Sequence, residues 1–334
     1  MGYLYVLAAA VLWGLLGPVS RFAMRDGVDP LEIAFWRALI AGACFGVHAV
    51  AIGRTRMERR DLPAAVGFGL VGVALFFAAY FNAVRSGGAA LASVLLYTAP
   101  VWVALLSAVF LRERMNRRTL LAVTLAIAGV AGIALAGGGS VRLTPAALSW
   151  GLLSGWAYAT YYLVGKRYFT RYHAATFFLY ALPVGALALL PFVRFGHKTA
   201  TAWAVLVFLA VVPTYGSFLL YGAGLRTVDA TRASTVATLE PVVAAVAAFA
   251  VWGERMGAGG YLFALLVVAA VVLMVTGERT DPSSPGPFSR TAGEGENGNS
   301  NSNGNGNRNH ITPNRSRLTS PAVWERSKKG DSAV

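Results

Sequence analysis

One ionisable side chain lies in the middle of an otherwise apolar segment of this chain. Glu240 stands within the stretch Ala233–Met256, directly before Pro241. Ten residues of helix counted from Ala230 place it about 15 Å along the helix, near the centre of a hydrocarbon layer about 30 Å thick. A carboxyl group at that depth can carry a coupling proton or bind the ammonium group of a substrate. The alternative is a structural carboxyl that satisfies backbone groups freed by a kink at Pro241.

A charge of opposite sign, Arg37, lies inside a second apolar segment that begins at Leu31. The helical rise places Arg37 about 9 Å from the start of that segment. At this depth the side chain can snorkel to the membrane surface, or it can point inward as the counter-ion of a substrate or protein carboxylate. Both interpretations of Arg37 stay open from the sequence.

Aromatic and amide side chains supply further candidates for the wall of a binding cavity. The deeper ones are Trp13, Asn82, Tyr97 and Tyr158. Tyr97 precedes Pro100 by one helical turn, so a kink there can present its hydroxyl group to a cavity. Tyr80 and Tyr221 fall nearer to segment ends, where tyrosine commonly forms interfacial belts.

Catalytic chemistry has little support in the sequence. The chain has four histidines and one cysteine, Cys44, so an intrachain disulfide and a thiol-based metal site are excluded. HExxH, GxSxG and phosphate-binding glycine loops followed by Lys are absent from the sequence. We therefore expect a protein that is not an enzyme and has no cofactor and no metal site.

The composition is that of a membrane protein, with 56% hydrophobic and 13% charged residues and a mean hydropathy of +0.56. The apolar runs predict an all-α fold with ten transmembrane helices. Their expected ranges are Tyr3–Met24, Leu31–Gly53, Leu62–Ala83, Ala89–Leu111, Leu120–Ala136, Leu148–Gly165, Ala174–Phe195, Ala202–Tyr221, Asp229–Trp252 and Gly259–Val275.

The net charge of +14 reflects orientation rather than binding to nucleic acid, because the basic residues gather in loops and in the last part of the chain. Alternate loops differ in their content of Lys and Arg, and the richer set lies on the side of the amino terminus. Since such loops stay in the cytoplasm, both termini are predicted to be cytoplasmic in a multi-pass plasma-membrane protein.

The chain contains an internal repeat. Ala92–Met115 matches Ala233–Met256 at an offset of 141 positions, and Ala99 stands where the second copy has Glu240. Nearer the start of the repeat the offset becomes 143. Each repeat holds five predicted spans, an odd number, so the two halves must be inverted relative to each other, as in many transporters. The predicted units are residues 1–137, 145–277 and a disordered cytoplasmic tail at 278–334.

Charged and small residues complete the scaffold. Glu113 and Glu254 are repeat mates at segment ends, where they are expected to set the register or bond neighbouring helix termini; a role in gating is the alternative. Small residues that let helices approach closely are Gly42, Gly46, Gly129, Gly132, Gly151 and Gly155. They favour packing within one chain, and a homodimer through the fifth and tenth spans is a further option.

The paired segments, the LEPV of Leu239–Val242, FWRALIAG (Phe35–Gly42) and VLWG (Val11–Gly14) together resemble the ten-helix, EamA-type members of the drug/metabolite transporter superfamily. The resemblance covers residues 3–276. It implies an inverted-repeat bundle that moves small metabolites, often exporting amino acids or related solutes.

We therefore expect a secondary transporter that works by alternating access, whose partners are a small-molecule substrate, membrane lipid and, if transport is coupled, protons. The alternatives are a uniporter or importer of similar solutes, or a lipid-handling or regulatory membrane protein without a soluble substrate.

Overall fold

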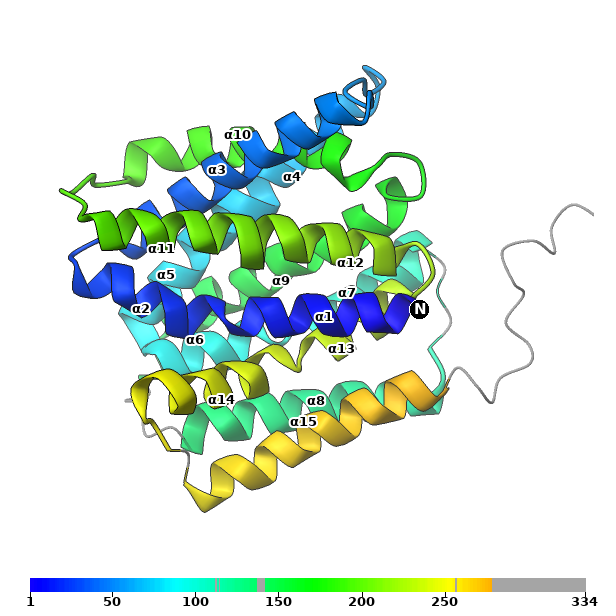
Figure 1. Ribbon diagram of the computed structural model, residues 1–334. Helices are drawn as coiled ribbons and strands as arrows, with labels where there is room; N and C mark the ends of the chain where they lie inside the picture. The colour runs from blue at the N-terminus through cyan, green and yellow to red at the C-terminus, as the bar shows by residue number, and fades with distance from the viewer. Residues whose placement is uncertain (112, 114, 137–141, 256, 278–334) are drawn as a thin grey trace, which may run out of the picture. The chain divides into compact units, whose positions relative to one another are not determined.

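The computed structural model describes residues 1–277 except 112, 114, 137–141 and 256. The predicted tail at 278–334 lies outside the described residues. Helices account for the ordered elements of the described part of the chain (Figure 1).

The first repeat forms five spans, three of which are interrupted. Its elements are α1 (Gly2–Gly14), α2 (Leu16–Arg25), α3 (Pro30–Ala51), α4 (Leu62–Phe68), the π-helical segment η1 (Gly69–Leu75), α5 (Phe76–Gly87), α6 (Ala89–Leu96), α7 (Ala99–Leu106), the π-helical segment η2 (Ser107–Leu111) and α8 (Arg117–Ala136).

The second repeat follows the same order of spans. Its elements are α9 (Pro145–Tyr168), α10 (Ala174–Leu189), the 3-10 turn η3 (Leu190–Phe192), α11 (Ala200–Ala210), the π-helical segment η4 (Val211–Gly216), α12 (Ser217–Leu225), α13 (Ala230–Ala237), α14 (Glu240–Trp252) and α15 (Ala258–Gly277).

Within the described part of the chain, nine helical segments are long and apolar enough to cross a membrane. The tenth span is α9, whose 24 residues give a length of about 36 Å, enough to cross a hydrocarbon layer of about 30 Å. It is less apolar because it carries serine, threonine and tyrosine side chains. α9 packs against α5, α6 and α7, and its Ser154, Tyr161 and Tyr162 side chains are buried in the bundle. The prediction of ten transmembrane helices in an all-α fold is confirmed.

The element boundaries reproduce the sequence repeat. α6 and α13 begin 141 positions apart, at Ala89 and Ala230, and α7 and α14 also begin 141 positions apart, at Ala99 and Glu240. Helix α9 matches the combined range of α1 and α2 at an offset of 143 positions. The two offsets in the sequence therefore correspond to two blocks of equivalent helices.

The two repeats pack with inverted symmetry. α1 packs against α12 and α5 packs against α9, which are equivalent contacts with the repeats exchanged. α8 and α15 run antiparallel, because the Arg118 Nη2 at the start of α8 donates to Thr276 Oγ1 at the end of α15, at 2.8 Å. The described chain begins and ends at the same end of this helix pair (Figure 1). The assignment of that end to the cytoplasm remains a prediction.

Glycines allow the close contact between α8 and α15. A Cβ atom at Gly129 would lie 2.7 Å from the Val267 side chain, and one at Gly132 would lie 2.0 Å from Phe263. In a lipid environment such close van der Waals packing, rather than removal of apolar surface from water, holds helices together. The face of α8 that carries Gly129 and Gly132 is thus packed against α15 of the same chain.

Candidate functional site

Glu240 lies at the break that divides the ninth span. α13 ends at Ala237 and α14 begins at Glu240, so the carboxylate stands at the first residue of a new helix. The break forms here because Pro241 has no N–H to donate to the Ala237 carbonyl group and is favoured in the first turn of a helix. The Glu240 side chain is half-buried.

The first helix passes close to the backbone of this break. A Cβ atom at Gly14 would lie 2.9 Å from the Glu240 carbonyl oxygen and 2.6 Å from Val243 Cβ. Gly14 therefore lets the end of α1 approach the start of α14 more closely than any other residue could.

Two tyrosines interact with the Glu240 carboxylate through their hydroxyl groups. Tyr97 lies at the end of α6, at the equivalent break of the fourth span, where Pro100 begins the next helix. Tyr158 comes from the middle of α9. The breaks between α6 and α7 and between α13 and α14 thus contribute Tyr97 and Glu240 to one site. Helix α9 contributes a third side chain, Tyr158.

The Arg37 guanidinium group is the positive charge of this site. Arg37 interacts electrostatically with Glu240, and its Nε donates to Thr214 Oγ1 at 3.1 Å. Thr214 lies in η4 and its hydroxyl donates to the Leu209 carbonyl oxygen five residues earlier, at 2.7 Å. The guanidinium also lies 5.7 Å from the centre of the Phe77 ring. The structure contradicts the snorkelling interpretation, because Arg37 is held inside the bundle.

Tyr80 and Tyr162 extend the site beyond the residues predicted from sequence, and the expected belt position of Tyr80 is therefore wrong. The charge of Glu240 acts on both hydroxyl groups. Tyr80 lies within 3.4 Å of Ser93 Oγ, and Tyr162 contacts Tyr158 with ring centres 5.3 Å apart. Tyr158 and Tyr162 are four residues apart in α9, so their side chains lie on the same face of that helix.

Two predicted wall residues have other surroundings. Trp13 is 4% exposed and packs in an aromatic cluster, 5.1 Å from Tyr221 and 5.8 Å from Tyr161 between ring centres. Asn82 donates its amide to the Ala78 carbonyl oxygen at 2.8 Å, one turn earlier in α5. The expected belt position of Tyr221 is wrong, because this side chain is fully buried.

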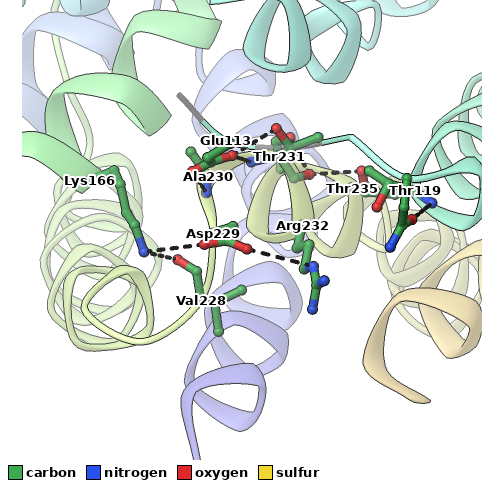
Figure 2. Close-up of polar contacts among 11 residues, drawn as sticks. Glu113, Thr119, Lys166, Val228, Asp229, Ala230, Thr231, Arg232 and Thr235 are labelled. Atoms are coloured by element: carbon green, nitrogen blue, oxygen red, sulfur yellow. Dashed lines mark hydrogen bonds and ion pairs between the residues drawn. The ribbon is translucent and has the colours of Figure 1, made fainter. Parts of the chain in front are cut away.

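At one end of the bundle, Glu113 forms hydrogen bonds with the start of α13 (Figure 2). Its carboxylate accepts hydrogen bonds from Ala230 N at 2.9 Å, Thr231 N at 3.2 Å and Thr231 Oγ1 at 3.0 Å. Glu113 therefore caps the N-terminus of α13, where unpaired N–H groups and the helix dipole favour a negative charge. The predicted bonding of a neighbouring helix terminus is confirmed for Glu113.

The repeat mate of Glu113 makes a different contact. Glu254 forms an ion pair with Arg21 of α2. Beside it, Trp252 Nε1 donates to the Pro18 carbonyl oxygen at 3.0 Å, and the Arg25 guanidinium lies 4.0 Å from the centre of the Trp252 ring. The two ends of the bundle are therefore held by chemically different contacts, although their sequences are related by the repeat.

No metal centre is formed within the described ranges, which contain no group of three His, Cys, Asp or Glu residues able to hold an ion. The chemistry of the site rests on one carboxylate, one guanidinium group and several hydroxyl groups. Such a set can bind a small charged solute and exchange a proton.

The sequence profile of the EamA-like transporter family matches the chain twice, at residues 1–135 and 145–276. This chain belongs to the EamA-like transporter family. The two matches coincide with the two five-helix repeats.

Relatives of this EamA-like transporter include an "Uncharacterized transporter" of Archaeoglobus fulgidus, 32% identical over 276 residues, which cover 80% of this chain and 96% of that protein. A "Probable terminal-alkyne amino-acid exporter" of Streptantibioticus cattleyicolor is 30% identical over 290 residues, covering 84% and 96%. A solved structure titled "Crystal structure of protein" has a TM-score of 0.73 at 19% identity, covering 83% of this chain and 97% of that one. The last similarity concerns the fold alone.

Proposed function

We propose that this EamA-like transporter is a secondary active exporter of amino acids or related small solutes, coupled to protons entering the cell. The observation that carries the proposal is the site at the paired helix breaks, where Glu240 faces Tyr97, Tyr158 and the positive charge of Arg37. A relative named as an amino-acid exporter supports the same solute class.

The two charges of the site complement a zwitterion. The Glu240 carboxylate can pair with an ammonium group, and the Arg37 guanidinium can bind a carboxylate through two parallel hydrogen bonds. Tyrosine hydroxyl groups can donate or accept in either arrangement. A solute with both charges would separate Glu240 from Arg37 and replace each partner by one of its own groups.

Proton coupling follows from the same carboxylate. A proton on Glu240 removes the negative charge that holds the ammonium group, so proton and solute compete for one position. A charge inside the membrane is costly without a partner; Arg37 is that partner of Glu240 in the structure, and a proton or the ammonium group of the solute replaces it in turn. That competition converts proton entry into release of the solute.

Alternating access requires motion at the breaks. Pro100 and Pro241 each remove one backbone hydrogen bond from their spans, so α6 and α13 can tilt against α7 and α14 at modest cost. The Glu113 contact with α13 and the Glu254 contact with α2 close the opposite ends. Opening one end at a time would expose Glu240 to one side of the membrane.

Counterflow of labelled amino acids into proteoliposomes, with an imposed pH gradient, tests the proposal. The wild-type protein should exchange at least one zwitterionic solute and accumulate it in response to the gradient. Glu240→Gln should abolish the gradient-driven part, while Asp26→Asn, which makes the same chemical change at an exposed loop, should behave as wild type.

Three results would contradict the proposal. Gradient-driven accumulation that survives in Glu240→Gln would remove Glu240 from coupling. Exchange without any response to the gradient would indicate a uniporter of the same solutes. Absence of exchange across a broad panel of solutes would favour a lipid-handling or regulatory protein.

A further inference from the structure

A cavity of about 390 Å³ lies where the loop after α3 meets the turn between α9 and α10. It is lined by Gly53, Arg54, Thr55, Arg56, Arg171, Tyr172, His173 and Thr176. None of these residues belongs to the Glu240 site, and the cavity serves no step of the proposed transport.

Hydroxyl groups of the neighbouring helix fix the loop that forms this cavity. Thr176 Oγ1 donates to the Arg54 carbonyl oxygen, and Tyr180 Oη donates to the Thr55 carbonyl oxygen at 2.8 Å. Tyr172 Oη donates to Asp61 Oδ2 at 2.6 Å. The cavity is therefore built from both sides by defined contacts.

The charges around the cavity are unbalanced. Arg171 is neutralised, because its guanidinium forms ion pairs with Glu58 and with Asp61, the latter at 2.7 Å. Among the residues that the structure describes, neither Arg54 nor Arg56 pairs with a carboxylate. Two guanidinium groups are thus available to a ligand.

The start of α10 adds to the positive potential. His173 caps this helix by accepting a hydrogen bond from Ala175 N at 3.2 Å, so the positive end of the helix dipole faces the cavity. Burial of the ring, followed by the charges of His48, Arg226 and Arg54, lowers the pKa of His173. Burial disfavours the charged form of the ring, and the surrounding positive charges add to that effect.

We propose that this cavity binds a phosphate group through Arg54 and Arg56, which the positive end of α10 faces. Arginine suits phosphate because its planar guanidinium can donate two parallel hydrogen bonds. The phosphate can belong to the headgroup of an anionic lipid or to a free phosphate ion. Val47 and Val50, 72% and 68% exposed, stand in the last turns of α3, shortly before the loop that lines the cavity, and offer apolar surface to lipid chains.

The test uses full-length protein in lipid nanodiscs, with one arm for each source of phosphate. The first arm titrates inorganic phosphate into nanodiscs of phosphatidylcholine and measures the dissociation constant by calorimetry. The second arm measures by native mass spectrometry how strongly the protein retains phosphatidylglycerol after transfer from mixed nanodiscs. Binding in either arm is expected, and the arm identifies the source.

Arg54→Gln/Arg56→Gln should weaken this binding about 30-fold, because each basic residue near an anionic group contributes about fivefold. The matched control is Arg59→Gln/Arg117→Gln, which removes two exposed arginines outside the cavity and should change binding less than twofold. If the double variant fails to fold, the single variants Arg54→Gln and Arg56→Gln should each weaken binding about fivefold.

Two results would overturn the proposal. One is that the wild-type protein binds phosphate in neither arm. The other is that the control loses as much affinity as the cavity variants, which would indicate attraction by net charge alone. Transport by these variants is measured separately, because the proposal does not depend on the Glu240 site.

Discussion

Replacing Glu113 by alanine would test whether its contact with α13 keeps one end of the bundle closed. The change removes three hydrogen bonds, to Ala230 N, Thr231 N and Thr231 Oγ1. Loss of a helix N-cap costs about 1 kcal/mol, and loss of a carboxylate at a helix N-terminus costs up to about 1 kcal/mol more. The total of about 2 kcal/mol corresponds to a roughly 30-fold shift toward an open end.

Thiol labelling can measure this shift. Ser234 is 1% exposed on α13, so a cysteine placed there by Ser234→Cys reacts with a membrane-impermeant maleimide only when that end opens. The natural cysteine is removed by Cys44→Ser. If opening is fast relative to labelling, the rate is proportional to the open population, and Glu113→Ala should raise it about 30-fold.

The control for this experiment is Glu254→Ala, which breaks the contact with Arg21 at the other end. It should leave the labelling of Ser234→Cys unchanged or lower it. An unchanged rate in Glu113→Ala would refute the closing role of Glu113. An equal increase in both variants would show general loosening of the bundle instead.

Three further predictions concern packing, the site and pH. Gly132→Ala should lower the thermal unfolding midpoint in detergent, because a Cβ there would lie 2.0 Å from Phe263, and such overpacking costs about 1–3 kcal/mol. Thr214→Val should raise the KM for the zwitterionic solute about fivefold in proteoliposomes, because Arg37 loses a hydrogen bond worth about 1 kcal/mol. The pKa of His173 is lowered below 6.5 in the folded protein, so the unfolded chain binds a proton more readily and stability should fall as the pH decreases through 6.5. His173→Asn, which can still cap α10, should reduce this fall in unfolding experiments across that pH range.

Matched variants separate these effects from general damage. Gly17→Ala adds the same atom where nothing lies within 4 Å and should leave the midpoint unchanged. Thr201→Val makes the same substitution as Thr214→Val, but at an exposed position, and should leave KM unchanged. The packing argument would be contradicted if Gly17→Ala lowered the midpoint as much as Gly132→Ala, and the site argument if Thr201→Val raised KM as much as Thr214→Val. A pH response of His173→Asn equal to that of the wild type would contradict the argument about His173.

The sequence predicted the scaffold well because the repeat and the prolines act locally. Pro100 and Pro241 interrupt backbone hydrogen bonding wherever they stand in a helix, and the breaks at Tyr97 and Glu240 follow from them. The expected depth of Glu240 was calculated from the helical rise alone. These features require no knowledge of neighbouring helices.

Contacts between spans could not be predicted in the same way. The hydrogen bond that Arg37 donates to Thr214 joins residues 177 positions apart in the sequence. The burial of Tyr221 depends on the packing of several helices around it, whereas its place near a segment end suggested the membrane surface. Tyr162 was overlooked for the same reason, because one sequence does not show which face of α9 meets Glu240.

The replacement of Glu240 by Ala99 in the first repeat has a consequence for the energetics of transport. With one carboxylate at the paired breaks, each cycle of the proposed exchange returns one proton for one solute. A zwitterion carries no net charge, so the cycle moves one positive charge into the cell. The membrane potential then contributes about 2.3 kcal/mol per 100 mV to every molecule exported, and the exchange would run on voltage even without a pH difference.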